Sequence, residues 1–241
     1  MSTGTITWNG TTSISLGVYV SGTNAHNAAE ADMTAYQIPG RNGDLVVSNN
    51  RYKNITVTYP AFIPHSLATN EQAIRNWLRG SNDYEELTDT YDTSHFRLAR
   101  TISELAFQPV RPDAANFEIS FDCMPQRFLT SGTSPVTLSS TTVVTNPTAF
   151  DAKPLITLTS IAASAEIEFN GSVAMTATTS YQNTVIIDCE TQNIYDSVTL
   201  DNKNSLFDVS DGFPVLSPGS NTITVTGTVS SASMKPRWWE L

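Results

Sequence analysis

An alternation of apolar and polar residues at every second position is the feature that most constrains how this chain folds. The clearest run lies within residues 117–123, where Phe, Ile, Phe and Cys are separated by single polar residues. Similar runs recur within residues 14–20, 55–59 and 96–102, and Arg100 interrupts the apolar face of the last one. Because side chains of a strand point alternately to opposite faces, this pattern predicts half-buried strands and a mainly β fold.

One segment departs from the alternation and predicts a single helix near residues 69–79. Thr69 is suited to be its N-cap, and Gln72 follows at the spacing of a capping box. The apolar residues then recur at helical spacing, at Ile74, Trp77 and Leu78. Gly80 supplies a stop signal, so we expect about three turns of helix packed on a sheet through Trp77.

The composition indicates two β domains. A small, polar, proline-containing stretch at residues 131–145 is typical of a linker, which gives an N-terminal domain at 1–130 and a C-terminal domain at 146–241. The second domain contains short apolar runs separated by turns, at Leu155–Ile161, Glu166–Phe169, Val173–Ala177, Thr184–Cys189 and Thr222–Val229. The best hairpin turn is Asn170-Gly171, because both positions suit φ > 0. These features predict a β-sandwich or small barrel.

Charge is sparse and mostly acidic, which excludes several classes of protein. The 13 basic and 23 acidic residues give a net charge of −10 and are only 15% of the chain, against ~25% in an average domain. With 39% hydrophobic residues, the chain is not expected to be disordered. It also lacks the basic surface of a strong nucleic-acid binder. No apolar run approaches the ~18 residues of a membrane-spanning helix, so we expect no membrane insertion.

The arginines are concentrated in the N-terminal domain. Residues 1–130 hold eight of the nine arginines but only one of the four lysines, Lys53. Arginine forms planar, bidentate pairs and is favoured at interfaces, so this bias is consistent with a domain that assembles with copies of itself. The alternative is a general preference for arginine over lysine, and composition does not separate the two.

The sequence offers little catalytic chemistry. It contains no motif of a P-loop, a Rossmann domain or an α/β-hydrolase, and His26, His65 and His95 have no metal-binding spacing. The acidic pair Asp188 and Glu190 falls on one strand face, too close together to flank a sugar as acid and base. We therefore predict no enzyme activity, no metal and no cofactor, and two buried free cysteines. A hydrolase using these acids or the acidic hairpin at residues 85–92 is the less favoured alternative.

Several longer segments resemble the distal tail proteins of siphophages, the Dit family. In the first half these are Ile38–Leu45, Tyr84–Leu87, His95–Arg100 and the exit strand FEISFDCMPQRFL at residues 117–129. In the second half they are residues 146–156, 186–195, 212–221 and the closing PRWWEL at 236–241. Each motif alone is a turn or a strand pattern, but their joint order over nearly the whole chain is specific.

The resemblance implies a structural protein of the virion, at the tip of a long non-contractile tail. A tail-tube-like N-terminal β domain would build a homohexameric ring, and the C-terminal domain would be a β-sandwich like those of galectins and carbohydrate-binding modules. The ring would join the tail tube protein to the tail-tip or baseplate hub protein, with the tape measure protein as a further candidate partner. Phage DNA would cross its lumen only as cargo, and assembly would take place in the cytoplasm of the host bacterium.

Two further expectations follow from the resemblance. We predict that Arg41, Arg97 and Arg100 lie near contacts between subunits, where acidic loops such as the one at Glu85-Glu86 supply partners. Residues 146–241 leave room for a sandwich only, so we expect no inserted arm for receptor-binding proteins. The alternative function is a module that attaches the phage to surface glycans, with Trp238-Trp239 as its aromatic residues.

Overall fold

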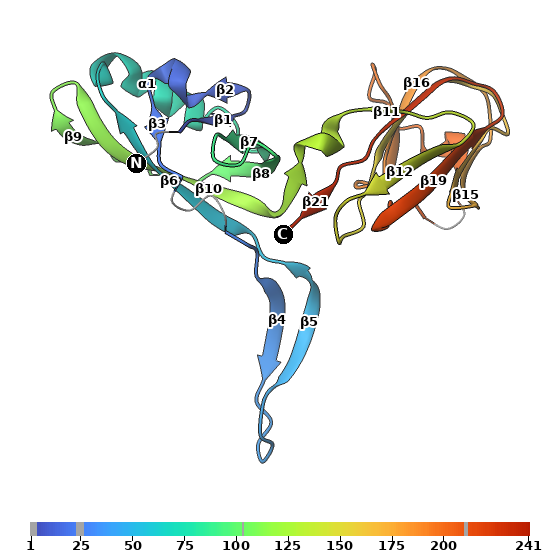
Figure 1. Ribbon diagram of the computed structural model, residues 1–241, viewed down its shortest axis with the longest axis horizontal. Helices are drawn as coiled ribbons and strands as arrows, with labels where there is room; N and C mark the ends of the chain where they lie inside the picture. Colours follow the sequence, from blue (N-terminus) through green and yellow to red (C-terminus); the bar gives the residue numbers. More distant parts are fainter. Residues whose placement is uncertain (1–3, 23–26, 103, 210–211) are drawn as a thin grey trace. The chain divides into compact units, whose positions relative to one another are not determined.

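The computed structural model describes residues 4–22, 27–102, 104–209 and 212–241. The chain forms two compact units, residues 1–127 with Leu241, and residues 128–240 (Figure 1). The second unit includes the segment at residues 131–145, which was expected to be a linker. Each unit has a hydrophobic core of its own. Among the described residues, no helix has both the length and the apolar character needed to cross a membrane.

The N-terminal unit is a curved antiparallel sheet with the strand order β2-β1-β7-β8-β10-β6-β3. The bounds of these strands are β1 Ile6–Trp8, β2 Thr11–Thr12, β3 Tyr19–Val20, β6 Ile55–Ile63, β7 Glu85–Asp89, β8 His95–Thr101 and β10 Ala114–Leu129. A further strand, β9 (Gln108–Arg111), pairs with the start of β10. Gly4 and Val20 exchange backbone hydrogen bonds of 2.9 Å, which link the start of β1 to β3. The sheet therefore curves back on itself around its core.

The alternation within residues 117–123 is confirmed as the central strand of this unit. Strand β10 pairs with β6 from Ala115↔Ile63 to Cys123↔Ile55, and its residues Phe117, Ile119, Phe121 and Cys123 are buried. The ring of Phe121 lies 5.9 Å from that of Trp8, centroid to centroid. The period-two pattern thus faces a continuous apolar core.

The predicted helix is confirmed, but it begins earlier than expected. Helix α1 spans Leu67–Leu78, and its N-cap is Ser66 in the left-handed region (φ 62°), without a side-chain cap. Thr69 lies inside the helix, so the expected capping box is wrong. Trp77 donates a hydrogen bond of 3.1 Å from Nε1 to the carbonyl of Trp8, which fixes the helix to β1. The apolar stripe is buried as expected.

Strand β8 faces the opposite way from the prediction. The face with Phe96 and Leu98 was expected to be the core face, but the buried residues are Arg97 and Ala99. Arg97 is accommodated inside because one of its amino groups donates 2.8 Å to the carbonyl of Asn27. A paired arginine can take a core position that a pattern based on hydrophobicity assigns to an apolar residue.

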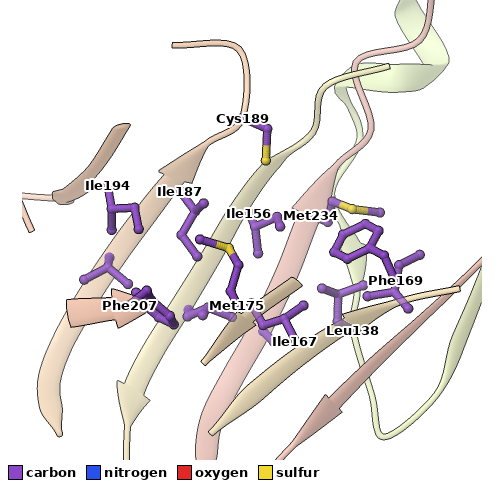
Figure 2. Close-up of a cluster of buried hydrophobic side chains, with 14 of the residues drawn as sticks. Leu138, Ile156, Ile167, Phe169, Met175, Ile187, Cys189, Ile194, Phe207 and Met234 are labelled. Atoms are coloured by element: carbon purple, nitrogen blue, oxygen red, sulfur yellow. The ribbon is translucent and has the colours of Figure 1, made fainter. Parts of the chain in front are cut away.

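The C-terminal unit is a β-sandwich, as expected. One sheet has the order β11-β20-β13-β16-β17 and the other β12-β19-β14-β15-β18. The strands are β11 Val136–Thr137, β12 Thr142–Asn146, β13 Leu155–Ile161, β14 Glu166–Phe169, β15 Ser172–Ala177, β16 Tyr181–Asp188, β17 Asn193–Asp196, β18 Phe207–Asp208, β19 Gly219–Thr226 and β20 Val229–Lys235. A last short strand, β21, covers Trp239–Glu240. Figure 2 shows the core between the sheets, where Ile156 and Ile187 of one sheet meet Ile167 and Met175 of the other.

Two details of this unit differ from the sequence prediction. The segment at 131–145 is not a linker, because β11 pairs with β20 and β12 pairs with β19. The run expected as one strand at Thr222–Val229 is the end of β19 and the start of β20, with Gly227 in the turn at φ 76°. The predicted turn at Asn170-Gly171 is confirmed, with φ values of 52° and 82°.

Candidate assembly surface

A β-hairpin in the N-terminal unit is largely exposed to solvent. Strands β4 (Ala31–Tyr36) and β5 (Leu45–Tyr52) pair only with each other and form a sheet of their own (Figure 1). All eight residues of β5 are exposed. A two-stranded hairpin is at best marginally stable in water, so a solitary one of this length is expected to gain stability from a partner.

Both faces of this hairpin carry apolar side chains. The register pairs Tyr36 with Leu45 and Thr34 with Val47, which places Tyr36, Leu45 and Val47 on one face. The pairing of Ala35 with Val46 and of Met33 with Ser48 places Met33 and Val46 on the other, and an irregularity in the register separates them from the pair Ala31↔Tyr52 at the base. The side chains of Met33 and Val46 are each 55% exposed. A surface hairpin with a single partner needs only one apolar face, so this one is suited to burial on both sides.

Polar pairs hold the base of the hairpin in register. Arg51 Nε donates a hydrogen bond of 2.6 Å to Asp32 Oδ2, and this bond lowers the pKa of the Asp32 carboxyl. Lys53 Nζ lies 3.7 Å from Glu30 Oε1. These charged pairs lie at the end of the hairpin that leads into β6, while the strand ends nearer the turn carry the apolar side chains and the turn itself carries Arg41 and Asp44. The hairpin is therefore anchored at its base and presents its outer half.

The predicted interface arginines lie in three different environments. Arg41 occupies the turn between β4 and β5, where its backbone N–H donates 3.1 Å to the carbonyl of Ile38 and its side chain is exposed. Arg100 is 49% exposed and donates 2.9 Å from Nε to Asp122 Oδ2, with its guanidinium over the ring of Tyr84. Exposure makes both available to a partner, and their place in a subunit contact stays a prediction.

Arg97 lies inside the N-terminal unit. Its side chain borders a cavity of about 20 Å³, room for one water molecule, together with Tyr59, Asp92, His95 and Arg127. Its Nη1 is buried with no hydrogen-bond partner among the described residues. Burial lowers the pKa of the guanidinium. Arg97 therefore has an internal position instead of the predicted place near a subunit contact.

The paired carboxylates are used in internal hydrogen bonds. Asp188 Oδ1 accepts 2.6 Å from Arg237 Nη1 and 3.0 Å from the backbone N–H of Glu190. In the acidic hairpin, Asp89 accepts hydrogen bonds from Tyr59 and from two backbone N–H groups that follow it. Asp89 and Asp92 line the small cavity beside Arg97 together with His95, whose Nδ1 lies 2.9 Å from Asp92 Oδ2. No group of ligands suited to a metal ion occurs among the described residues, and His26 lies outside them.

The tryptophan pair at the C-terminus is also engaged within its unit. Trp238 is 5% exposed and belongs to the core of the sandwich. Trp239 stacks on Phe150 with ring centroids 4.4 Å apart, and its Nε1 donates 2.9 Å to the carbonyl of Asp151. A sugar-binding platform needs an exposed aromatic face. The pair is therefore better explained as packing than as a glycan site.

The sequence prediction missed most of the hairpin. The resemblance identified the turn around Arg41, but Leu45-Val46-Val47 has no period-two alternation and was not assigned to a surface element. An apolar run next to an Asn-Gly turn was the available signal, because it indicates a hairpin strand that is apolar on both faces.

The whole chain has the fold of a phage hub protein. A solved structure, that of SPP1 Dit (gp 19.1), superposes with a TM-score of 0.71 and 12% sequence identity, covering 99% of this chain and 99% of that one. That protein is described as a paradigm of the hub adsorption apparatus in phages that infect Gram-positive bacteria. No family model matches the sequence, and no curated protein matches it.

Proposed function

We propose that this chain is a structural protein of a phage tail tip, which assembles into a ring at the distal end of a long non-contractile tail. The observation that carries the proposal is the fold shared with SPP1 Dit over 99% of both chains. A match of that extent includes both the sheet of the N-terminal unit and the C-terminal sandwich. Fold alone does not define function, so the proposal also draws on the surface of this chain.

The hairpin supplies the second line of support. A cyclic ring is built from heterologous contacts, in which one patch of a subunit meets a different patch of the next. An element with two apolar faces and two unpaired edges is suited to such contacts, because edge strands are otherwise a liability for aggregation. We propose a homohexamer whose N-terminal units form the ring.

The acidic net charge of the chain supports a ring through whose lumen DNA passes. Phage DNA would cross the lumen without being bound, and strong binding requires clustered Lys and Arg that neutralise phosphates. The net charge of −10 offers no such excess. The tail tube protein on one side and the tail-tip hub protein on the other are the proposed partners, with the tape measure protein as a third.

Imaging and mass measurement of the purified chain test the proposal. We expect light scattering to give a mass near six subunits and negative-stain images to show a ring with a central opening. Antibody labelling of intact particles should place the chain at the tail tip. A chain that stays monomeric at high concentration and is absent from purified tails would overturn it.

A further inference from the structure

A groove of about 510 Å³ opens on the outer face of the N-terminal sheet, over β3, β6 and β10. Along β6, Tyr59, Ala61 and Ile63 point into the core, so Pro60 and Phe62 point outward and form part of its floor. Its volume lies in the range of ordinary binding pockets. Val20, Ala61 and Phe117, which are buried in the core of this unit, also line the groove, so the groove lies directly against that core.

The groove is apolar at its floor and acidic at its border. Glu104 and Glu118 both line it and are exposed, and its described lining includes no lysine or arginine. Neither carboxylate takes part in an ion pair among the described residues. Two unpaired acids beside Phe62 and Pro60 are suited to a segment that combines an apolar side chain with a cation.

The turn of the hairpin carries an apolar side chain and a cation, Ile38 and Arg41, with the exposed Asp44 at its end, next to β5. Ile38 is 40% exposed, and Arg41 follows three residues later with no salt bridge from its guanidinium to any described residue. A Cβ added at Gly40 or Gly43 would meet nothing within 4 Å, so the turn is uncovered at both positions. Both glycines have φ of 82°, which fixes a tight and well-defined turn.

We propose that the hairpin turn of one copy docks into the groove of the next copy, with Arg41 facing Glu104 and Glu118. Ile38 then covers the floor at Phe62 and Pro60. The inference rests on the proposed ring, because it names the surface that receives the hairpin. The turn and the groove are different patches of one chain. Each subunit therefore inserts its turn into one neighbour and accepts the turn of the other neighbour in its groove. This is the heterologous geometry that a closed ring needs.

Charge reversal of either patch tests the contact. Arg41→Glu places a third carboxylate against the groove, and the double variant Glu104→Lys/Glu118→Lys repels Arg41. We expect each to weaken association at least about tenfold in sedimentation velocity, because like charges brought together in an interface are strongly unfavourable. All three positions are exposed, so thermal unfolding should stay at the wild-type temperature. Arg79→Glu, an exposed reversal on the same unit, is the matched control and should assemble normally.

A mixing experiment then separates this contact from any other effect of charge. In a mixture, the acidic turn of the Arg41→Glu variant faces the basic groove of the Glu104→Lys/Glu118→Lys variant. The turn of the latter variant, which keeps Arg41, faces the acidic groove of the former. We expect an equimolar mixture to recover rings in which the variants alternate, as native mass spectrometry would show. Neither variant alone should form them.

The outcomes distinguish this inference from the proposed function. A wild-type chain that forms no oligomer would contradict the ring itself. A wild-type ring with both reversal variants assembling normally would leave the ring standing and overturn the docking of the turn. If combining all three substitutions in one chain restores assembly but mixing does not, the turn occupies the groove of its own chain, which also contradicts the inference.

Discussion

Removal of the hairpin is predicted to abolish assembly while leaving the fold intact. Ala31 and Tyr52 are Cα partners at its base, so residues 32–51 can be replaced by Asn-Gly, which closes a two-residue turn between them. Within the part of the chain that the structure describes, the two strands pair with no other strand, and β6 begins three residues after β5 ends. The free energy of unfolding of the single chain should therefore change by less than about 1 kcal/mol, as for other exposed sites.

The effect on association is much larger. Seven large apolar side chains of the hairpin are 36–55% exposed: Met33, Tyr36, Ile38, Leu45, Val46, Val47 and Tyr52. Full burial of such a side chain contributes about 1.5–3 kcal/mol, so burying the exposed half of all seven contributes roughly 5–10 kcal/mol per copy. That is comparable to the ~4–15 kcal/mol that association costs. Its loss should weaken association by more than about a thousandfold.

Light scattering across a concentration series, together with thermal unfolding, measures both quantities. The isosteric variant Val46→Thr/Val47→Thr is the matched control, because it keeps the strands and removes one apolar group from each face. This variant should associate more weakly than the wild type but more strongly than the shortened chain. The reasoning is refuted if the shortened chain assembles as well as the wild type. It is also refuted if shortening lowers the unfolding temperature by many degrees, since the hairpin would then belong to the core.

Three smaller predictions concern the fold. Gly227→Ala should lower the free energy of unfolding by about 2 kcal/mol or more, measured by urea denaturation, because φ is 76° and the new Cβ would lie 2.8 Å from the Cα of Ala165. The two cysteines should not react with a thiol reagent at pH 8 until the chain unfolds, since burial raises the pKa of both thiols to about 12. Burial raises the pKa of the Asp188 carboxyl, but its hydrogen bonds and the charge of its neighbours, Arg237 foremost, together lower the pKa by more, so the folded value lies below the ordinary one. The stability that this pair adds is complete above about pH 4 and lost as the pH falls through the folded pKa, so Asp188→Asn should flatten the acid limb of thermal stability.

Local sequence patterns were sufficient to predict the structure where residues close in sequence are also in contact in the fold. The turn at Asn170-Gly171 and the buried stripe of α1 could be predicted because each depends on residues a few positions apart. The strand order could not, since β1 pairs with β7 about eighty residues away. Arg97 shows a second limit. Its burial depends on the carbonyl of Asn27, seventy residues earlier, and no local pattern contains that contact.

The assembly surface was only partly predictable for a related reason. An apolar run such as Leu45-Val46-Val47 has the same appearance whether its own chain or another chain covers it. The turn at Arg41 was recognisable because glycine and asparagine favour left-handed backbone. That the strands behind it stay uncovered is a property of the whole structure. The groove that we assign to the turn combines β3, β6 and β10, which no sequence window contains.

The uncovered hairpin also bears on how the protein behaves before it assembles. A free subunit exposes two unpaired strand edges and apolar side chains on both faces, and such segments associate indiscriminately when crowded. Newly made chains therefore face a competition between ordered closure and precipitation, and its outcome depends on their concentration and on how quickly neighbours arrive. Overproduction without its tail partners should yield inclusion bodies more readily than moderate synthesis, and the shortened chain should remain in the soluble fraction.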